Sequence, residues 1–185
     1  MKQENTVLYI LRLTVTLLLI CAFVALALAG VNAITKDKIA AVKAEKTQKA
    51  IAAVLPGSVK VEEVTFTDAT GLVTKVYQDL ATGYAVEVAP NGFGGAITMM
   101  VGVSVDGKVL GISIISHAET PGLGAVASAN TDKGAAFRDQ FIGLISGITI
   151  GDGNNQIDAL SGATISSQAI VDGVNAALAC VANLG

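Results

Sequence analysis

Residues 97–115 read ITMMVGVSVDGKVLGISII, and this stretch decides the fold. Apolar side chains recur at every second position in two runs that flank Asp106-Gly107. The alternating positions are Val101, Val103, Val105, Ile112 and Ile114. A period of two is typical of half-buried antiparallel strands, and Asp-Gly favours a two-residue hairpin turn of type I′. The stretch therefore predicts a β-hairpin with strands at residues 97–105 and 109–115.

Further β-like runs precede this hairpin, and a helical pattern ends the chain. Residues 59–66, 72–77 and 84–88 are short β-like runs separated by turn-forming residues. Residues 166–183 carry apolar side chains at helical spacing, which predicts a final helix packed on the sheet. These side chains are Ile170, Val174, Leu178 and Val181, and Cys180 beside them is expected to be a buried small hydrophobe.

The region between the hairpin and the final helix predicts smaller elements. Residues 133–145 predict a short helix with three apolar side chains on one face. These are Phe137, Phe141 and Ile145. Residues 148–160 predict a polar loop with a short strand near Ile157. Together these patterns predict an α+β domain with a mainly antiparallel sheet flanked by helices.

The composition adds a membrane segment to this domain. Of 185 residues, 52% are hydrophobic and 15% are charged, whereas a soluble domain usually carries about a quarter charged residues. Residues 13–35 contain no charged side chain and as a helix would span about 34 Å, enough for a tilted transmembrane helix. Two Cys and one His exclude a disulfide scaffold and a Cys-rich zinc site. Residues 50–185 hold five basic and twelve acidic side chains, which disfavours nucleic-acid binding.

The apolar segment admits two interpretations. Lys2 and Arg12, followed by Ala27-Leu28-Ala29, resemble a cleaved signal peptide. The apolar run exceeds the usual core of such a peptide, so an uncleaved anchor is favoured. A lipoprotein signal at Cys21 is disfavoured because Ile20 is bulky where a small residue is expected.

Five lysines within residues 36–49 complicate the orientation of the domain. Taken literally, the positive-inside rule places the domain that follows them in the cytoplasm. The same lysines would either contact anionic lipid headgroups or form a solvated helix face. The expected organisation is a cytoplasmic tip and transmembrane anchor at residues 1–35, a connecting helix at 36–57 that Pro56-Gly57 ends, and a domain at 58–185.

Three segments are candidate parts of a site. Residues 91–95 read NGFGG and form either a hairpin loop or a place where backbone approaches a ligand. Residues 117–124 read HAETPGLG, and we reject a dinucleotide-binding loop there because Pro121 intervenes and no βαβ unit follows. Residues 158–164 read DALSGAT before the final helix. Either Ser161 or Thr164 caps that helix, or its free N–H groups bind a phosphate.

Together the three segments resemble the FMN-binding domain family, and in particular the G subunits of Rnf electron-transport complexes. The resemblance covers nearly the whole chain. It implies FMN linked covalently through its phosphate to the Thr164 hydroxyl by a flavin transferase, and no metal held by this chain. It also implies that Glu119, Thr120 and Leu123 contact the isoalloxazine ring. The other cofactor-binding candidates are Pro121, Gly122, Asp158, Ser161, Gly162, Ala163, Gly94, Gly95 and His117.

The resemblance implies a redox subunit of a membrane complex, not a complete enzyme. That complex would couple electron transfer between ferredoxin and NAD to Na⁺ or H⁺ translocation, with the flavin domain on the extracytoplasmic face of the cytoplasmic membrane. This sequence has no NAD loop and no iron–sulfur Cys set, so other subunits must supply those sites. His117 and Glu119 are the candidates for handling protons.

Three alternatives stay open at this point. The first is the C subunit of Na⁺-translocating NADH:quinone reductase, which is usually a longer chain. The second is another flavinylated extracytoplasmic electron-transfer domain. The third, from a different class, is a membrane-tethered binding or scaffold domain without flavin, which would tolerate Thr164→Ala.

Overall fold

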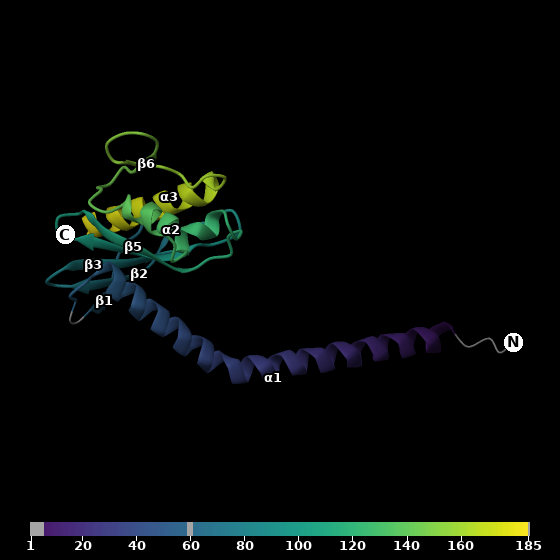
Figure 1. Ribbon diagram of the computed structural model, residues 1–185. Helices are drawn as coiled ribbons and strands as arrows, with labels where there is room; N and C mark the ends of the chain where they lie inside the picture. Colours follow the sequence, from purple (N-terminus) through teal and green to yellow (C-terminus); the bar gives the residue numbers. More distant parts are fainter. Residues whose placement is uncertain (1–5, 59–60, 185) are drawn as a thin grey trace. The chain divides into compact units, whose positions relative to one another are not determined.

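The structure is a computed structural model that describes residues 6–58 and 61–184 (Figure 1). The chain divides into two compact units, Met1–Glu45 and Lys46–Gly185. The helix α1 (Thr6–Val54) runs through the first unit and contributes its last turns to the second. The start of the strand predicted from residue 59 lies outside the described residues.

The N-terminal apolar helix is confirmed. Its large apolar side chains from Leu8 to Ile34 are exposed, as expected for a surface that lipid covers. Among the described residues, two helices are long and apolar enough to cross a membrane, α1 and α3 (Thr164–Ala182). Most of α3 is buried within the domain, so α3 is a core helix and α1 is the candidate span.

A five-stranded antiparallel sheet forms the centre of the second unit, in the order β1-β2-β3-β4-β5. This confirms the predicted sheet class. The strands are β1 (Glu62–Val64), β2 (Val73–Asp79), β3 (Gly83–Val88), β4 (Thr98–Ser104) and β5 (Val109–Ser116). Each strand pairs with its neighbour in sequence, so short hairpin connections are sufficient to build the sheet.

The β4–β5 turn differs from the predicted type I′ turn. The N–H of Gly107 donates to the carbonyl of Ser104 at 2.9 Å, and the N–H of Ser104 donates to the carbonyl of Lys108 at 2.8 Å. Gly107 has φ +74°, whereas Asn155 is the single non-glycine residue with positive φ in the described chain. A type I′ turn needs positive φ at both central residues. The predicted turn type was therefore wrong, because Gly107 is the last residue of a four-residue turn that begins at Ser104.

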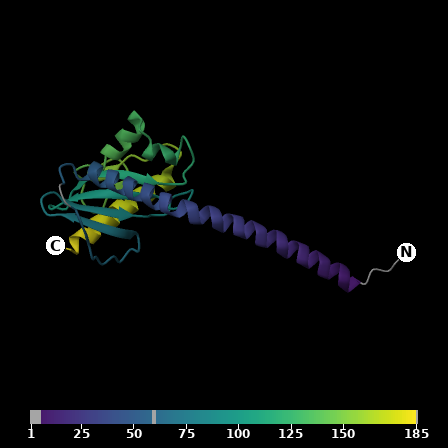
Figure 2. The same ribbon diagram turned by 90° about the horizontal axis from the view of Figure 1, so that it is seen from below.

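The two faces of the sheet are covered by different helices (Figures 1 and 2). On one face α3 packs against Val86, Val101 and other residues of the larger core cluster, which confirms the predicted burial of its apolar stripe and of Cys180. On the other face Ile51, Leu55 and neighbouring residues at the end of the first helix pack against Ala85 and Met100. The predicted stripe of the connecting helix is thus buried only at its C-terminal end, since Ile39 and Val42 are exposed.

The region between β5 and α3 contains more short helices and strands than predicted. It contains the 3₁₀ helix η1 (Gly124–Ser128), the helix α2 (Asp132–Asp139) and two short parallel strands, β6 (Thr149–Ile150) and β7 (Gln156–Ile157). Phe137 and Phe141 pack edge to face with ring centroids 5.6 Å apart. The prediction of a helix to residue 145 was wrong: Gly143 has φ +82°, its N–H donates to Val109, and Ile145 is 53% exposed.

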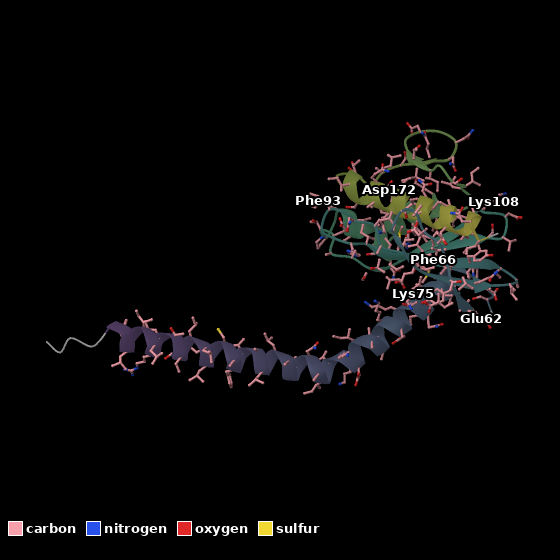
Figure 3. All side chains as sticks on the ribbon, turned by 180° about the vertical axis from the view of Figure 1, so that it is seen from behind. Glu62, Phe66, Lys75, Phe93, Lys108 and Asp172 are labelled. Carbon is pink, nitrogen blue, oxygen red and sulfur yellow. The ribbon has the colours of Figure 1, made fainter. Side chains whose placement is uncertain are left out.

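Three connections converge at one end of the sheet. These are the β3–β4 connection, the segment after β5, and the segment before α3. Phe93 in the first connection and Lys108 in the β4–β5 turn lie at opposite ends of the domain (Figure 3). The motifs singled out in the sequence therefore gather at the end away from the β4–β5 turn.

Candidate functional site

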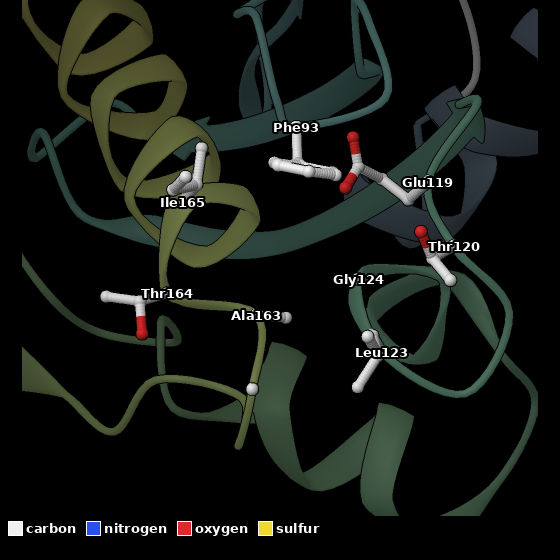
Figure 4. A pocket seen from close by; sticks show the side chains of 9 residues that line it. Phe93, Glu119, Thr120, Leu123, Gly124, Ala163, Thr164 and Ile165 are labelled. Carbon is white, nitrogen blue, oxygen red and sulfur yellow. The ribbon is translucent and has the colours of Figure 1, made fainter.

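A pocket of about 380 Å³ lies where the three connections meet (Figure 4). Binding pockets for small molecules usually measure 300–1,000 Å³. Thr164 and Ile165 lie on the α3 side, and Thr120 and Leu123 lie on the opposite side. The lining residues are Phe93, Glu119, Thr120, Leu123, Gly124, Gly162, Ala163, Thr164 and Ile165.

A tight turn places Thr120 and Leu123 on the pocket wall. The N–H of Leu123 donates to the carbonyl of Thr120 at 3.2 Å, across Pro121 and Gly122. Gly122 has φ +79°, and proline followed by a glycine of positive φ is the sequence of a type II turn. Pro121 and Gly122 thus shape the wall without lining it, and they bring a hydroxyl and an apolar side chain to the same pocket.

Glu119 joins all three connections. Its carboxylate is 6% exposed and accepts a hydrogen bond from Gly94 N–H at 2.9 Å. Its other oxygen accepts from the buried Ser166 hydroxyl in the first turn of α3. Because these partners come from the loop before β4 and from α3, one buried side chain fixes the relative positions of the pocket walls.

The glycines of the NGFGG segment allow its backbone to lie close to Glu119. A Cβ on Gly94 would overlap the carbonyl group of Ala118, whose carbon would lie only 2.8 Å away. A Cβ on Gly92 would overlap a Glu119 carboxylate oxygen. The segment forms the predicted hairpin loop, in which Gly92 N–H donates to the carbonyl of Gly95 at 2.8 Å, and its glycines let the backbone approach the Glu119 segment.

His117 supports the Glu119 segment from outside the pocket. Its Nδ1 accepts a hydrogen bond from Glu119 N–H at 3.1 Å, which leaves the proton on Nε2. Nε2 lies 2.7 Å from the Ser128 hydroxyl, which in turn donates to the carbonyl of Ala125. His117 thus links the start of the loop to η1.

The start of α3 offers free donors to the pocket. Its N-cap residue is Ala163, and no side chain caps the helix. The prediction that Ser161 or Thr164 caps α3 was therefore wrong, because Thr164 is already the first helical residue. Uncapped N–H groups and the positive end of the helix dipole favour an anion at this position. Thr164, the first residue of this helix, is exposed and lines the pocket.

The DALSGAT segment is held in place by its neighbours on both sides. The N–H of Asp158 donates to the Gln140 side chain at 2.7 Å, and the N–H of Leu160 donates to the Ser167 hydroxyl at 3.0 Å. Gly162 has φ +72°, and a Cβ there would lie 3.2 Å from Leu123. The segment therefore reaches α3 as a fixed turn pressed against the opposite pocket wall.

The structure brings together six of the residues singled out in the sequence. Glu119, Thr120, Leu123, Gly162, Ala163 and Thr164 line the pocket. The other candidates stand behind or beside it: Gly94, Gly95, His117, Pro121, Gly122, Asp158 and Ser161. Sequence reasoning missed Phe93, Gly124, Ile165 and Ser166. The exposed aromatic at the centre of the glycine-rich segment was a usable signal, since Phe93 is 72% exposed.

The charge of the pocket is carried by Glu119. None of the lining residues is basic. Within residues 6–58 and 61–184, no three His, Cys, Asp or Glu side chains are grouped as metal ligands. The arrangement combines an anion site, an apolar wall and a hydroxyl, and this combination fits a phosphorylated ligand with a flat ring.

Comparison with known proteins agrees with this geometry. The model of the FMN-binding domain family matches residues 92–179, which include all three pocket segments. The G subunit of the Na⁺-translocating ferredoxin:NAD⁺ oxidoreductase complex of Acetobacterium woodii is 31% identical over 95% of this chain and 93% of that protein. The G subunit of the ion-translocating oxidoreductase complex of Methanosarcina acetivorans is 32% identical over 91% and 93%. The G subunit of the proton-translocating ferredoxin:NAD⁺ oxidoreductase complex of Clostridium ljungdahlii is 42% identical over 51% of each chain.

The fold and the pocket thus define an FMN-binding protein with an N-terminal apolar helix, of the class that transfers electrons through a flavin. The chain belongs to the family of G subunits of Rnf-type ion-translocating oxidoreductase complexes. It is accordingly a membrane-associated redox subunit of a multi-subunit complex.

Proposed function

We propose that this subunit carries FMN covalently linked to Thr164 and relays electrons within a complex that couples electron transfer between ferredoxin and NAD to Na⁺ or H⁺ translocation. The observation that carries the proposal is the uncapped start of α3, where the exposed Thr164 lines a pocket that also has an apolar wall. Electron transfer is the chemistry that the flavin supplies when bound.

Different pocket residues would bind the phosphate and the ring of FMN. The free N–H groups at the start of α3 would receive the phosphate, whose negative charge the helix dipole favours there. Leu123, Ile165 and Phe93 offer apolar surface to a flat ring, and the Thr120 hydroxyl offers a polar contact at its edge. A phosphoester to Thr164 would be made by a flavin transferase, for which the exposed Thr164 is accessible.

The first experiment is in-gel flavin fluorescence after denaturing electrophoresis. The full chain is purified from its host or co-expressed with an exported flavin transferase, alongside Thr164→Ala and Thr164→Ser. Thr120→Ala is the matched control, because it removes the other threonine hydroxyl of the same pocket. We expect fluorescence in the wild type and in Thr120→Ala and none in Thr164→Ala. A dark wild-type band, with the transferase active on a second substrate, contradicts covalent flavinylation.

The flavin domain is proposed to lie on the extracytoplasmic face, where the transferase of the resembled family acts. The lysines that follow the apolar segment oppose this orientation under the positive-inside rule, but long domains translocate largely regardless of charge. Protease accessibility in intact cells tests the orientation. Cleavage of the domain only after lysis would place it in the cytoplasm.

A flavin-free scaffold is the competing function from another class. It predicts a colourless purified protein and normal assembly of the complex with Thr164→Ala. The uncapped start of α3 beside an apolar pocket favours flavin binding over this alternative, because a scaffold function does not require an open anion site.

A further inference from the structure

The pocket wall contains a buried carboxyl side chain, and none of the residues that line the pocket is basic. The Glu119 carboxylate is buried and accepts hydrogen bonds from two neutral donors, Gly94 N–H and the Ser166 hydroxyl. Such donors orient a carboxylate but leave its net charge unchanged. Of the two basic side chains of α2, Lys133 and Arg138, the second donates to the carbonyls of Ala127 and Ala129.

A fixed charge in such a wall acts on any ligand whose own charge changes. Adding two electrons and one proton to a neutral oxidised flavin ring gives a reduced ring of charge −1. The electrons come from a redox partner protein of the complex and the proton from solvent. Because buried charges are poorly screened by water and salt, a negative wall weakens binding of the reduced ring more than that of the oxidised ring.

We propose that Glu119 is an electrostatic tuning residue that lowers the reduction potential of the flavin in this pocket. This inference rests on the proposed function, since it requires bound FMN. It gives Glu119 a role beyond contact with the ring and beyond proton handling. Its two roles are compatible: the hydrogen bonds place the carboxylate on the wall, and the charge acts on the ring.

Redox titration of the flavin absorbance tests the proposal on the full flavinylated chain in detergent. In the wild type we expect a flavin reduction potential below that of free FMN in the same buffer. The difference should correspond to at least tenfold weaker binding of the reduced ring than of the oxidised ring. For a one-electron couple, tenfold corresponds to about 59 mV, and for a two-electron couple to about 30 mV. A wild-type potential equal to or above that of free FMN overturns the proposal without any variant.

Three variants separate charge from hydrogen bonding. Glu119→Gln removes the charge but keeps an acceptor for Gly94. We expect this variant to raise the flavin potential, by an amount that corresponds to at least a tenfold loss of discrimination against reduced FMN. Glu119→Asp keeps the charge, and Ser166→Ala keeps the charge but removes one hydrogen bond. Because both variants keep the charge, we expect both to keep a lower flavin potential than Glu119→Gln.

The outcomes distinguish this inference from the proposed function. Absence of flavin absorbance in the wild type contradicts the proposed function itself. Bound flavin with an unchanged potential in Glu119→Gln overturns the tuning role alone. If Glu119→Asp and Ser166→Ala shift the potential as far as Glu119→Gln does, hydrogen-bond geometry sets the potential, and the charge proposal is again overturned.

Discussion

Replacing Ser166 with alanine tests whether the Glu119 hydrogen bonds hold the pocket together. Ser166 is 2% exposed, and its hydroxyl donates to a carboxylate that is itself 6% exposed. Hydrogen bonds to charged groups contribute about 1.5–3 kcal/mol, roughly twice the contribution of neutral ones. Ser166→Ala leaves that oxygen of a buried carboxylate without this donor. We expect the free energy of unfolding of the domain to fall by about 2 kcal/mol.

Ser167→Ala is the matched control. Ser167 is also fully buried and follows Ser166 in the same helix. Its hydroxyl donates to the carbonyl of Ala163 and accepts from Leu160 N–H, both at 3.0 Å, so both partners are neutral. The gain in helix propensity from serine to alanine is similar at the two positions. Because two neutral hydrogen bonds of about 0.5–1.5 kcal/mol each are lost, we expect a loss of about 2 kcal/mol here too.

Urea unfolding of the full chain in detergent measures both losses. Tyrosine fluorescence follows the sheet, because Tyr77 lies on β2 and Tyr84 on β3. The same two substitutions are then made in Glu119→Gln, where the charge is gone. We expect the loss from Ser166→Ala to shrink in that background and the loss from Ser167→Ala to stay constant. An unchanged loss from Ser166→Ala in the Glu119→Gln background refutes the charged hydrogen bond as a source of stability.

Two further predictions concern the glycine-rich segment and a distant loop. Gly94→Ala should lower the free energy of unfolding by about 1–3 kcal/mol, because the added Cβ overlaps the backbone of Ala118. Gly111→Ala is the control and should cause no such loss, because an added Cβ there meets open space. Urea unfolding measures both variants. Burial raises the pKa of Asp68, but hydrogen bonds from Val73 and Thr70 outweigh it and lower the pKa overall. Asp68→Asn should therefore destabilise the domain at neutral pH, and its difference from the wild type should vanish as acid titrates the folded carboxyl. A difference that grows in acid would contradict this.

The fold followed closely from the sequence because its signals are local. Alternation in residues 97–115 predicts β4 and β5, and the apolar spacing at Ile170 and Val174 predicts the buried face of α3. The errors fall where one backbone angle decides the outcome. Gly107 occupies a different position of its turn from the one that Asp-Gly predicts, and Gly143 ends a segment that looks helical by side-chain spacing alone.

The candidate site was only partly predictable, because its organisation depends on contacts between distant segments. Thr120 and Leu123 follow from the Pro-Gly turn between them, and Thr164 follows from its place at the start of the final helix. The link from Glu119 to Ser166 spans 47 positions, and no local pattern marks it. Sequence patterns therefore give no signal for Ser166, and they present Phe93 only as part of a glycine-rich loop.

The exposed mouth of the pocket gives covalent attachment a physical reason. Phe93, Leu123 and Ile165 line it and yet stay substantially exposed, so a ring between them keeps contact with solvent on one side. A shallow apolar site and one helix terminus supply limited affinity, because binding must also offset the lost freedom of the ligand. The proposed tether at Thr164 would make ring docking intramolecular and so raise the effective concentration of the ring at the pocket. The ring can then stay exposed for electron exchange without being lost, which an enclosed non-covalent pocket would not permit.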